Sequence, residues 1–313
     1  MVKVFVDGQE GTTGLQINEY LEKRDDLEIL MIEPEERKNP VRRSDFLNSA
    51  DLVFLCLPDA ASREAVSLVT NSNTRIIDAS TAYRTDDSWV YGMPELNSEQ
   101  RDRIRNAARV SNPGCHATGF VLSMNPLVQQ GIVPKDYPAV CYSLTGYSGG
   151  GKKLIYTFEN KALSGINSPK HYALQLHHKH LPEMQHRTGL FYPPVFMPIV
   201  GNYYRGMVTS ISLLPRLLNK TVTVSDVKDI FLEYYQNEPF VKIMASDETC
   251  LENGFLNAEA CNGTNRLEIF VYGNDSQIVV MARFDNLGKG ACGAAIQNMN
   301  VMLGTEETLG LTR

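Results

Sequence analysis

The chain contains 313 residues, with 30 Lys+Arg against 36 Asp+Glu and a formal net charge of −6. A hydrophobic content of 43% and a charged content of 21% are typical of soluble globular proteins, and the length suggests two domains. The acidic balance argues against nucleic-acid binding, because that function needs surplus Lys and Arg to neutralise phosphates. The longest apolar runs, such as residues 52–57, are far shorter than the roughly 20 residues of a membrane helix, so no membrane partner is expected.

The start of the chain and its cysteines both favour a cytoplasmic location. Residues 1–6 read as a first strand and carry neither the apolar stretch nor the cleavage site of a signal peptide. The six cysteines include no C-x-x-C pair and no dense framework, which favours reduced thiols.

The first third of the chain alternates short apolar segments with segments of helical length. Strands are expected at residues 2–6, 28–32, 52–57 and 75–78, and helices at residues 12–23 and 62–70. Short strands rich in β-branched residues and separated by helices are typical of βαβ units. The sequence therefore predicts an α/β domain with a parallel sheet.

After residue 115 the strand-like segments become longer. They cover residues 139–145, 206–214, 267–272 and 276–284. The last two flank Gly273-Asn274-Asp275, which is a hairpin signal. Helical spacing of apolar residues recurs at 223–235, and residues 290–303 look helical again. We expect an α+β second domain with a mostly antiparallel sheet.

Three glycines, Gly8, Gly11 and Gly14, stand between the first strand and the first helix in a G-x-x-G-x-x-G pattern. Glycines at such a turn let the backbone approach a pyrophosphate, whose charge is then bound by the free N–H groups of the helix N-terminus. The first spacing is one residue longer than in the G-x-G-x-x-G pattern, and a purely structural turn is the alternative. The strand–loop–helix context favours nucleotide binding.

The choice between NAD and NADP stays open on these residues. Glu33 follows the second strand, where an acidic residue would bind a ribose 2′-hydroxyl. Four basic residues follow closely and are candidates for a 2′-phosphate: Arg37, Lys38, Arg42 and Arg43. A solvated loop of mixed charge explains the same pattern.

Cys115 is the candidate nucleophile. Pro113-Gly114 forces a turn, and a helix can begin at Cys115 and run to about residue 124. The dipole and free N–H groups of a helix N-terminus favour a thiolate and can bind an oxyanion. Cys56 and Cys141 lie within apolar strand segments and fit buried structural thiols instead.

Histidines crowd the stretch that follows: His171, His177, His178, His180 and His186. No carboxylate or cysteine recurs at ligand spacing, so no metal is expected. Several of these histidines fit surface positions, while one of them serving as the general acid/base for the thiolate is the sharper hypothesis.

Several motifs, taken in their order and spacing, carry a resemblance that runs nearly end to end. They are the glycine loop, Asn112-Pro113-Gly114-Cys115, and the segments 78–84, 91–95, 148–152, 178–183 and 285–291. With these motifs the chain resembles the N-acetyl-γ-glutamyl-phosphate reductases of arginine biosynthesis in their shorter form, within the semialdehyde dehydrogenase superfamily.

The resemblance implies a Rossmann-type NADP-binding domain and a catalytic domain. It also implies NADPH as cofactor, a small acyl-phosphate substrate, Cys115 as nucleophile and His180 as acid/base. The cofactor-binding residues it implies are Gly8, Gly11, Thr12, Thr13, Gly14, Ser80, Ser148, Gly149, Asn286 and Lys289. The substrate-binding residues it implies are Arg84, Asn112 and Glu183, the last of which could also position the histidine.

The chain departs from the family pattern at a few positions. His116 follows the nucleophile where longer members often carry an aromatic residue. Thr81 and Tyr83 stand where many members have alanine and phenylalanine. These differences leave the chemistry unchanged and bear on substrate preference.

The motifs place the domain border near Cys115. We expect residues 1–115 with about 286–313 to form the cofactor domain, and residues 116–285 to form the catalytic and oligomerisation domain. The Pro-rich apolar stretch at 190–200 suits a subunit interface, and a homodimer or homotetramer is expected.

Two kinds of alternative function remain on sequence grounds. The first keeps the chemistry and changes the substrate: an aspartate-semialdehyde dehydrogenase, or a lysine-pathway acyl-phosphate reductase. The second is a non-catalytic NADP-binding regulator, which the presence of both Cys115 and His180 disfavours.

Overall fold

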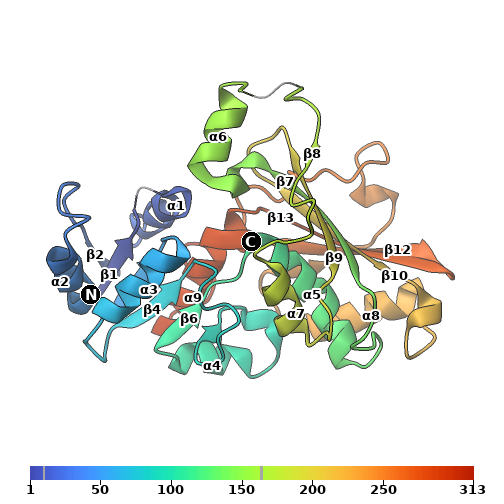
Figure 1. Ribbon diagram of the computed structural model, residues 1–313. Helices are drawn as coiled ribbons and strands as arrows, with labels where there is room; N and C mark the ends of the chain where they lie inside the picture. The colour runs from blue at the N-terminus through green and yellow to red at the C-terminus, as the bar shows by residue number, and fades with distance from the viewer. Residues whose placement is uncertain (10, 163–164) are drawn as a thin grey trace. The chain divides into compact units, whose positions relative to one another are not determined.

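The computed structural model describes residues 1–9, 11–162 and 165–313. The chain divides into two compact units. The first contains residues 1–113 and 291–311, and the second contains residues 114–290 and 312–313. Figure 1 shows the elements of both units along the chain.

The first unit is built on a parallel sheet of six strands. Its elements are β1 (Val2–Asp7), α1 (Thr12–Leu21), β2 (Leu27–Leu30), α2 (Pro40–Ser49), β3 (Leu52–Leu55), α3 (Asp59–Leu68), β4 (Arg75–Asp78), β5 (Val90–Tyr91), η1 (Pro94–Leu96), α4 (Gln100–Asn106), β6 (Arg109–Ser111) and α9 (Gly293–Leu303). The strand order is β2-β1-β3-β4-β6-β5, and every pair is parallel. The expected α/β domain of Rossmann type is confirmed.

This strand order reverses direction next to β1. From β1 the chain moves to β2 on one side and then to β3 on the other. Ligands of open α/β sheets bind outside the carboxyl ends of the strands at such a reversal. The glycine loop follows β1, so it lies at the reversal point.

Both faces of this sheet are covered. In β1, Val4 and Val6 belong to one buried cluster and Phe5 to another, since successive side chains of a strand point to opposite faces. The first cluster includes apolar residues of α1 and α9, and the second includes residues of α2 and α3. The C-terminal helix α9 therefore completes the core of the first unit.

Helix α3 begins three residues before the expected start at residue 62. Pro58 occupies the N-cap position and Asp59 the first turn, and both residues suit a helix start. The apolar spacing used for the prediction begins only one turn later, which explains the shift.

The second unit contains a mixed sheet of seven strands. Its elements are α5 (Cys115–Gln129), β7 (Val140–Gly146), η2 (Tyr147–Gly150), α6 (Gly151–Glu159), β8 (Lys170–His171), α7 (Leu181–Thr188), β9 (Val195–Gly201), β10 (Met207–Leu213), η3 (Pro215–Leu217), α8 (Val224–Tyr234), β11 (Val241–Ile243), η4 (Glu248–Cys250), β12 (Leu267–Asn274), β13 (Gln277–Phe284) and η5 (Gly288–Cys292). The strand order is β11-β12-β13-β10-β7-β9-β8.

Most pairs in this sheet are antiparallel, as expected, while β11 with β12 and β7 with β9 are parallel. Asn274 pairs with Gln277, so the hairpin turn consists of Asp275 and Ser276. Helix α5 packs against β10 and β13, and α8 packs against β12. This packing buries almost all of α5 behind its first residue.

Residues 290–303 are helical as expected, but the first of them are not α-helical. Residues Gly288–Cys292 form a π-helical turn, in which the Gly290 N–H donates to the Asp285 carbonyl, and α9 starts at Gly293. Single π turns recur at functional sites.

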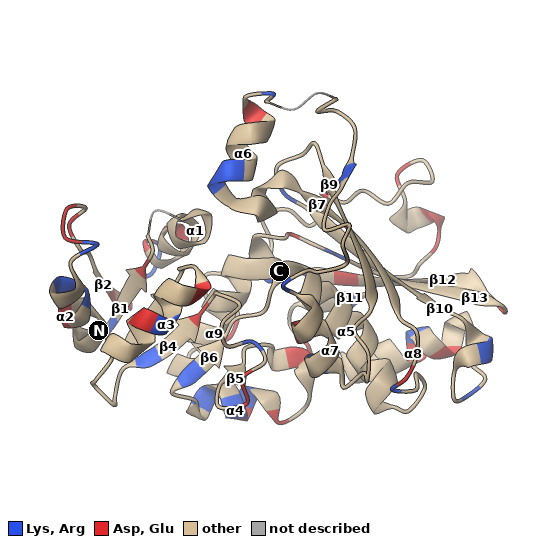
Figure 2. Cartoon of the chain, viewed as in Figure 1, with Lys and Arg blue, Asp and Glu red and all other residues tan. Residues whose placement is uncertain are grey.

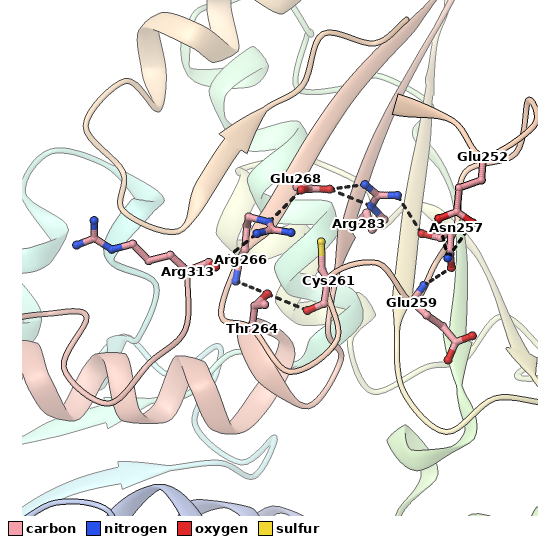
Figure 3. A network of polar contacts seen from close by, with 9 residues as sticks. All are labelled: Glu252, Asn257, Glu259, Cys261, Thr264, Arg266, Glu268, Arg283 and Arg313. Carbon is pink, nitrogen blue, oxygen red and sulfur yellow. Dashed lines mark hydrogen bonds and ion pairs between the residues drawn. The ribbon is translucent and has the colours of Figure 1, made fainter. Parts of the chain in front are cut away.

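Charged residues are sparse on the strands of the second unit (Figure 2). Strands β7, β9 and β10 contain none. The buried Glu268 of β12 accepts from Arg283 of β13 at 2.5 Å and pairs with Arg266 at 2.9 Å (Figure 3). Arg283 also donates to the Asn257 carbonyl at 3.1 Å. These contacts tie the β12–β13 hairpin to the loop that precedes it.

Candidate active site

Cys115 is the first residue of α5, as the Pro113-Gly114 turn predicts. Gly114 is the N-cap residue in extended conformation, and no side chain caps the helix. The thiol is half-buried. The uncapped N–H groups of the first turn and the helix dipole both favour a negative charge at this position.

Three of the other thiols lie in surroundings that disfavour a thiolate. Burial raises the pKa of Cys141, and it raises the pKa of Cys261 to about 11. Burial is also the main cause that raises the pKa of Cys56 well above its usual value. Cys115, in contrast, is half-buried at the N-terminus of α5, whereas Cys292, the N-cap residue of α9, is buried and bonds to Thr13 and Gln16.

Helix α7 brings two of the predicted site residues to the start of α5. The buried Glu183 accepts a hydrogen bond from the Gly114 N–H at 2.9 Å. His180 immediately precedes α7 and is also buried. Glu183 therefore holds the turn that presents Cys115.

Three histidine rings lie close together, and one of them belongs to His116, the residue after Cys115. The ring centroid of His116 lies 5.6 Å from those of His178 and His180, which are 4.8 Å apart. Burial lowers the pKa of His116 to about 3, with smaller contributions from His178 and Lys179. Burial and then Lys179 lower the pKa of His178 to about 4. Both rings are neutral at neutral pH.

The remaining histidines of the crowded stretch lie at the surface. His171, His177 and His186 are exposed. Among the described residues, no three His, Cys, Asp or Glu side chains are arranged to hold a metal ion.

Two residues near the nucleophile had no role in the sequence-based prediction. Gly290 packs against Cys115, and a Cβ added to it would lie 3.0 Å from that of Cys115. The Tyr172 hydroxyl lies 2.8 Å from Nε2 of His116. The sequence offers little signal for either, apart from Gly290 lying in the 285–291 motif and Tyr172 next to His171.

Three of the predicted cofactor residues in the second unit lie together. The Asn286 amide donates to the Ser148 hydroxyl at 3.0 Å and accepts from the Gly206 N–H at 2.8 Å. A Cβ on Gly149 would lie 3.5 Å from the same amide. Lys289 is buried, with its ammonium 5.9 Å from the centre of the Phe240 ring.

The glycine loop of the first unit has the geometry of a phosphate cradle. Gly8 has a φ of +91°, and its carbonyl accepts from the Gly11 N–H at 3.0 Å. A Cβ on Gly14 would collide with the Gly8 carbonyl. Thr12 and Thr13 open helix α1, whose N-cap Gly11 has no side-chain cap. These residues fit a dinucleotide pyrophosphate.

The side chains of Ser80 and Arg84 both form hydrogen bonds with residues of the first unit. The Ser80 hydroxyl donates to Asp78 at 2.6 Å, and burial raises the pKa of Asp78. The Arg84 guanidinium donates to the carbonyls of Asn112 and Ala79 at 2.9 and 3.0 Å. Arg84 thus supports the segment that leads into the nucleophile turn.

The side chain of Asn112 forms a hydrogen bond through each of its two polar atoms. Its side-chain amide donates to the Ala291 carbonyl at 2.9 Å, and its oxygen accepts from Asn298 at 3.1 Å. These bonds fix the chain just before Pro113.

The four candidates for a 2′-phosphate differ in their surroundings. Arg43 is buried and pairs with Asp7 at 2.8 Å, and Arg42 is exposed near Asp45. Arg37 and Lys38 lie between β2 and α2.

Two family models together match most of the chain. One described as "Semialdehyde dehydrogenase, NAD binding domain" matches residues 3–104. Another described as "Semialdehyde dehydrogenase, dimerisation domain" matches residues 115–286. Fold and matches define the class as the semialdehyde dehydrogenases. Solved aspartate semialdehyde dehydrogenases share the fold at 15% identity over 97% of this chain. The enzyme from Francisella tularensis is covered to 100% with a TM-score of 0.73, and enzyme II from Vibrio cholerae to 98% with a TM-score of 0.72.

Curated relatives define the family more finely. The chain is 48% identical to N-acetyl-gamma-glutamyl-phosphate reductase 2 of Nostoc sp., over 99% of both chains. It is 44% identical to the Pseudomonas putida protein of the same name, over 98% of both chains. The chain belongs to the N-acetyl-gamma-glutamyl-phosphate reductase family. The oxidoreductase class and the nicotinamide cofactor expected from the sequence are thereby confirmed.

Proposed function

We propose that the protein reduces N-acetyl-γ-glutamyl phosphate to N-acetylglutamate 5-semialdehyde and phosphate with NADPH, in arginine biosynthesis. The observation that carries the proposal is the half-buried Cys115 at the uncapped N-terminus of α5. The turn before it is held by Glu183, and His180 precedes the same helix α7.

The Cys115 thiolate would attack the acyl carbon of the substrate, and inorganic phosphate would leave. The product of this step is a thioester on Cys115. The first-turn N–H groups of α5 are placed to stabilise the oxyanion that forms during attack. Once the thioester carbon has been reduced, its bond to sulfur breaks and Cys115 leaves as a thiolate. His180 supplies or removes the proton at the substrate oxygen.

We assign the cofactor to the predicted residues of both units. In the first unit these are Gly8, Gly11, Thr12, Thr13, Gly14 and Ser80, and in the second they are Ser148, Gly149, Asn286 and Lys289. When bound, NADPH supplies the hydride. Because Arg43 is buried as well as paired with Asp7, the proposed contacts of the 2′-phosphate are the more accessible Arg37, Lys38 and Arg42. Arg84, Asn112 and Glu183 remain the proposed substrate-binding residues, and their contacts show that they also support the nucleophile turn.

The reverse reaction tests substrate, cofactor and acyl-phosphate chemistry together. Purified protein should reduce NADP⁺ with N-acetylglutamate semialdehyde, and the rate should depend on inorganic phosphate. Aspartate semialdehyde and the lysine-pathway semialdehyde serve as matched alternative substrates. A higher kcat/KM for either would replace the proposed substrate, and no turnover with any of the three would favour the non-catalytic regulator.

We further propose a homodimer, with a homotetramer as the larger alternative, formed through the open face of the second unit's sheet. Alternate residues of β7 and β9 are exposed or half-buried on that face, and Tyr142 and Val195 are each 46% exposed. Phe191 and Tyr192, just before β9, are 63% and 65% exposed. An uncharged apolar face of this kind suits a second copy of the chain. The match to a dimerisation domain over residues 115–286 supports this proposal.

A cytoplasmic location completes the proposal. All six cysteines are free, as in a reducing compartment. Over its described residues, the structure has no helix with the length and apolar character needed to cross a membrane.

A further inference from the structure

A line of four hydrogen-bonded side chains runs behind the nucleophile in the second unit. The Thr209 hydroxyl of β10 lies 3.0 Å from that of Ser143, its register partner on β7. Ser143 lies 2.6 Å from Nδ1 of His116, and Nε2 of the same ring lies 2.8 Å from the Tyr172 hydroxyl. The line therefore joins the centre of the sheet to a side chain beside Cys115.

The protonation state of the ring in this line is fixed by its surroundings. Thr209 and Ser143 are fully buried, and His116 is 3% exposed. Burial, His178 and Lys179 keep the pKa of His116 near 3. A neutral imidazole has one nitrogen that donates and one that accepts.

The direction of the hydrogen bonds follows from the hydroxyl hydrogens. If Nδ1 carried the proton, it would donate to Ser143, and Ser143 would donate to Thr209. The Thr209 hydrogen would then lack an acceptor, because Ser143 is the only partner of that hydroxyl among the residues that the structure describes. A buried donor without an acceptor is costly.

The other tautomer gives each of these hydrogens an acceptor. Thr209 then donates to Ser143, Ser143 donates to Nδ1 of His116, and Nε2–H donates to the Tyr172 oxygen. In this arrangement Tyr172 accepts a bond from the protein and keeps its own hydrogen for a ligand.

Tyr172 is placed to use that hydrogen in the site. The side chain is half-buried, and burial together with the charge of Cys115 raises the pKa of the phenol. The hydroxyl therefore stays protonated at neutral pH, and it is hydrogen-bonded to the ring of His116, the residue next to Cys115.

We propose that His116 is a positioning residue that, backed by Ser143 and Thr209, fixes the Tyr172 hydroxyl as a hydrogen-bond donor to a substrate oxygen that gains negative charge. Tyr172 is then a catalytic residue for the acyl-phosphate reaction. The role of Tyr172 toward the substrate rests on the proposed function. The tautomer of His116 rests on the hydrogen bonds alone.

The tautomer can be measured without activity. Protein labelled with ¹⁵N-histidine, free of ligands at pH 7, should show the nitrogen pattern of a neutral Nε2–H ring for His116, assigned by its loss in His116→Phe. Thr209→Val, which removes the first donor, should increase the fraction of the Nδ1–H form. The titratable and charged groups that act on the ring are Tyr172, His178, Lys179 and His180. A wild-type ring that is Nδ1–H or charged at pH 7 would overturn the proposal.

Kinetics test the donor itself. Tyr172→Phe should lower kcat by about 10- to 100-fold, as expected for a lost hydrogen bond to a charged oxygen, and should leave cofactor binding unchanged. His116→Phe should cause a similar loss, and the double variant should lose no more than the larger single effect. Tyr234→Phe is the matched control, because its hydroxyl bonds to Gln129 and Asn125 instead.

A kcat of Tyr172→Phe within twofold of wild type, or full additivity in the double variant, would overturn the proposal. If His116→Phe does not fold, the kcat of Tyr172→Phe still decides it. Wild-type protein inactive on every acyl phosphate would refute the proposed function instead, and the nitrogen spectrum would still report the tautomer.

Discussion

The thiol of Cys115 combines a helix N-terminus with partial exposure, whereas Cys292 at the N-terminus of α9 is buried. Cys115 occupies the first residue of α5, while Cys141 lies within a strand and has a raised pKa. A thiolate at a helix N-terminus is both reactive toward acyl carbon and able to leave. Reactivity should therefore be confined to one of the six cysteines.

Cys115→Ala should abolish turnover and leave the cofactor dissociation constant nearly unchanged. Steady-state assays and cofactor titration measure the two effects. In wild type, an alkylating agent followed by mass spectrometry should modify Cys115 ahead of Cys56 and Cys141. Substantial activity in Cys115→Ala, or equal alkylation of the three thiols, would show that Cys115 is not the nucleophile.

Arg84 offers a second test at the scale of one side chain. Its guanidinium donates to the Asn112 and Ala79 carbonyls, so Arg84→Ala leaves buried acceptors without donors. We expect a loss of about 2–4 kcal/mol in the free energy of unfolding, measured by denaturant titration. A rise in KM without a loss of stability would instead show that the side chain acts on the substrate alone.

The buried histidines make stability depend on pH. The pKa of His116 falls from 6.5 to about 3 on folding, and that of His178 to about 4, so the unfolded chain binds more protons below pH 6.5. This contribution is fully present above pH 6.5 and is lost as the pH falls toward 4 and then 3. Denaturant titrations between pH 7 and pH 5 should show falling stability, with a shallower slope in His116→Phe. An equal dependence of stability on pH in wild type and His116→Phe would contradict the lowered pKa of His116.

At the scale of elements, predicted site residues of both units lie at the starts of helices. Helix α1 follows the glycine loop, and α5 begins at Cys115; neither has a side-chain cap. Helix α7 adds Glu183, whose carboxylate satisfies the Gly114 N–H. Uncapped helix starts leave N–H groups available for the anions that this chemistry requires.

The glycine loop gives a prediction for α1. Gly14→Ala should weaken cofactor binding at least about tenfold, because its Cβ would collide with the Gly8 carbonyl and displace the first turn of the helix. Gly11→Ala changes another predicted cofactor-binding glycine of the loop, and a smaller loss of affinity is expected because its Cβ would meet the same carbonyl at 3.4 Å, an ordinary contact. Fluorescence titration with NADPH measures both. Equal affinities in the two variants would show that the close approach is unimportant.

At the scale of the whole molecule, the open sheet face of the second unit is the proposed interface with a second copy. Tyr142 and Val195 lie on neighbouring strands that carry no charge. Burying such a face against a second copy removes apolar surface from water without stranding a charged group. The strand register places the paired Glu268 and Arg283 on the same side of the sheet, but both side chains are buried and do not reach the exposed surface of β7 and β9.

Tyr142→Glu should shift the protein to monomers, because it introduces a charge into the proposed interface. Size-exclusion chromatography with light scattering measures the mass. Leu232→Glu on α8 is the control, since that residue is exposed to a similar extent, 44%, on a helix. An unchanged mass for Tyr142→Glu would move the interface elsewhere on the second unit.

The sequence by itself determined the class of each sheet, the helix start at Cys115 and the motifs that identify the family. These features depend on local patterns: apolar periodicity, Gly and Pro at turns, and residue types at fixed spacing. It misplaced the start of α3 and did not predict the π turn at Gly288–Cys292, because neither the N-cap at Pro58 nor the π turn is a periodic feature.

Only the tertiary structure decided which distant residues meet. Thr209, Ser143, His116 and Tyr172 come from separate segments, and strand register and helix packing join them into one hydrogen-bonded line. The sequence identified His116 as a departure from the family pattern but gave it no role. Its partners are set by long-range packing and by the need of buried polar groups for hydrogen bonds, neither of which leaves a pattern along the chain.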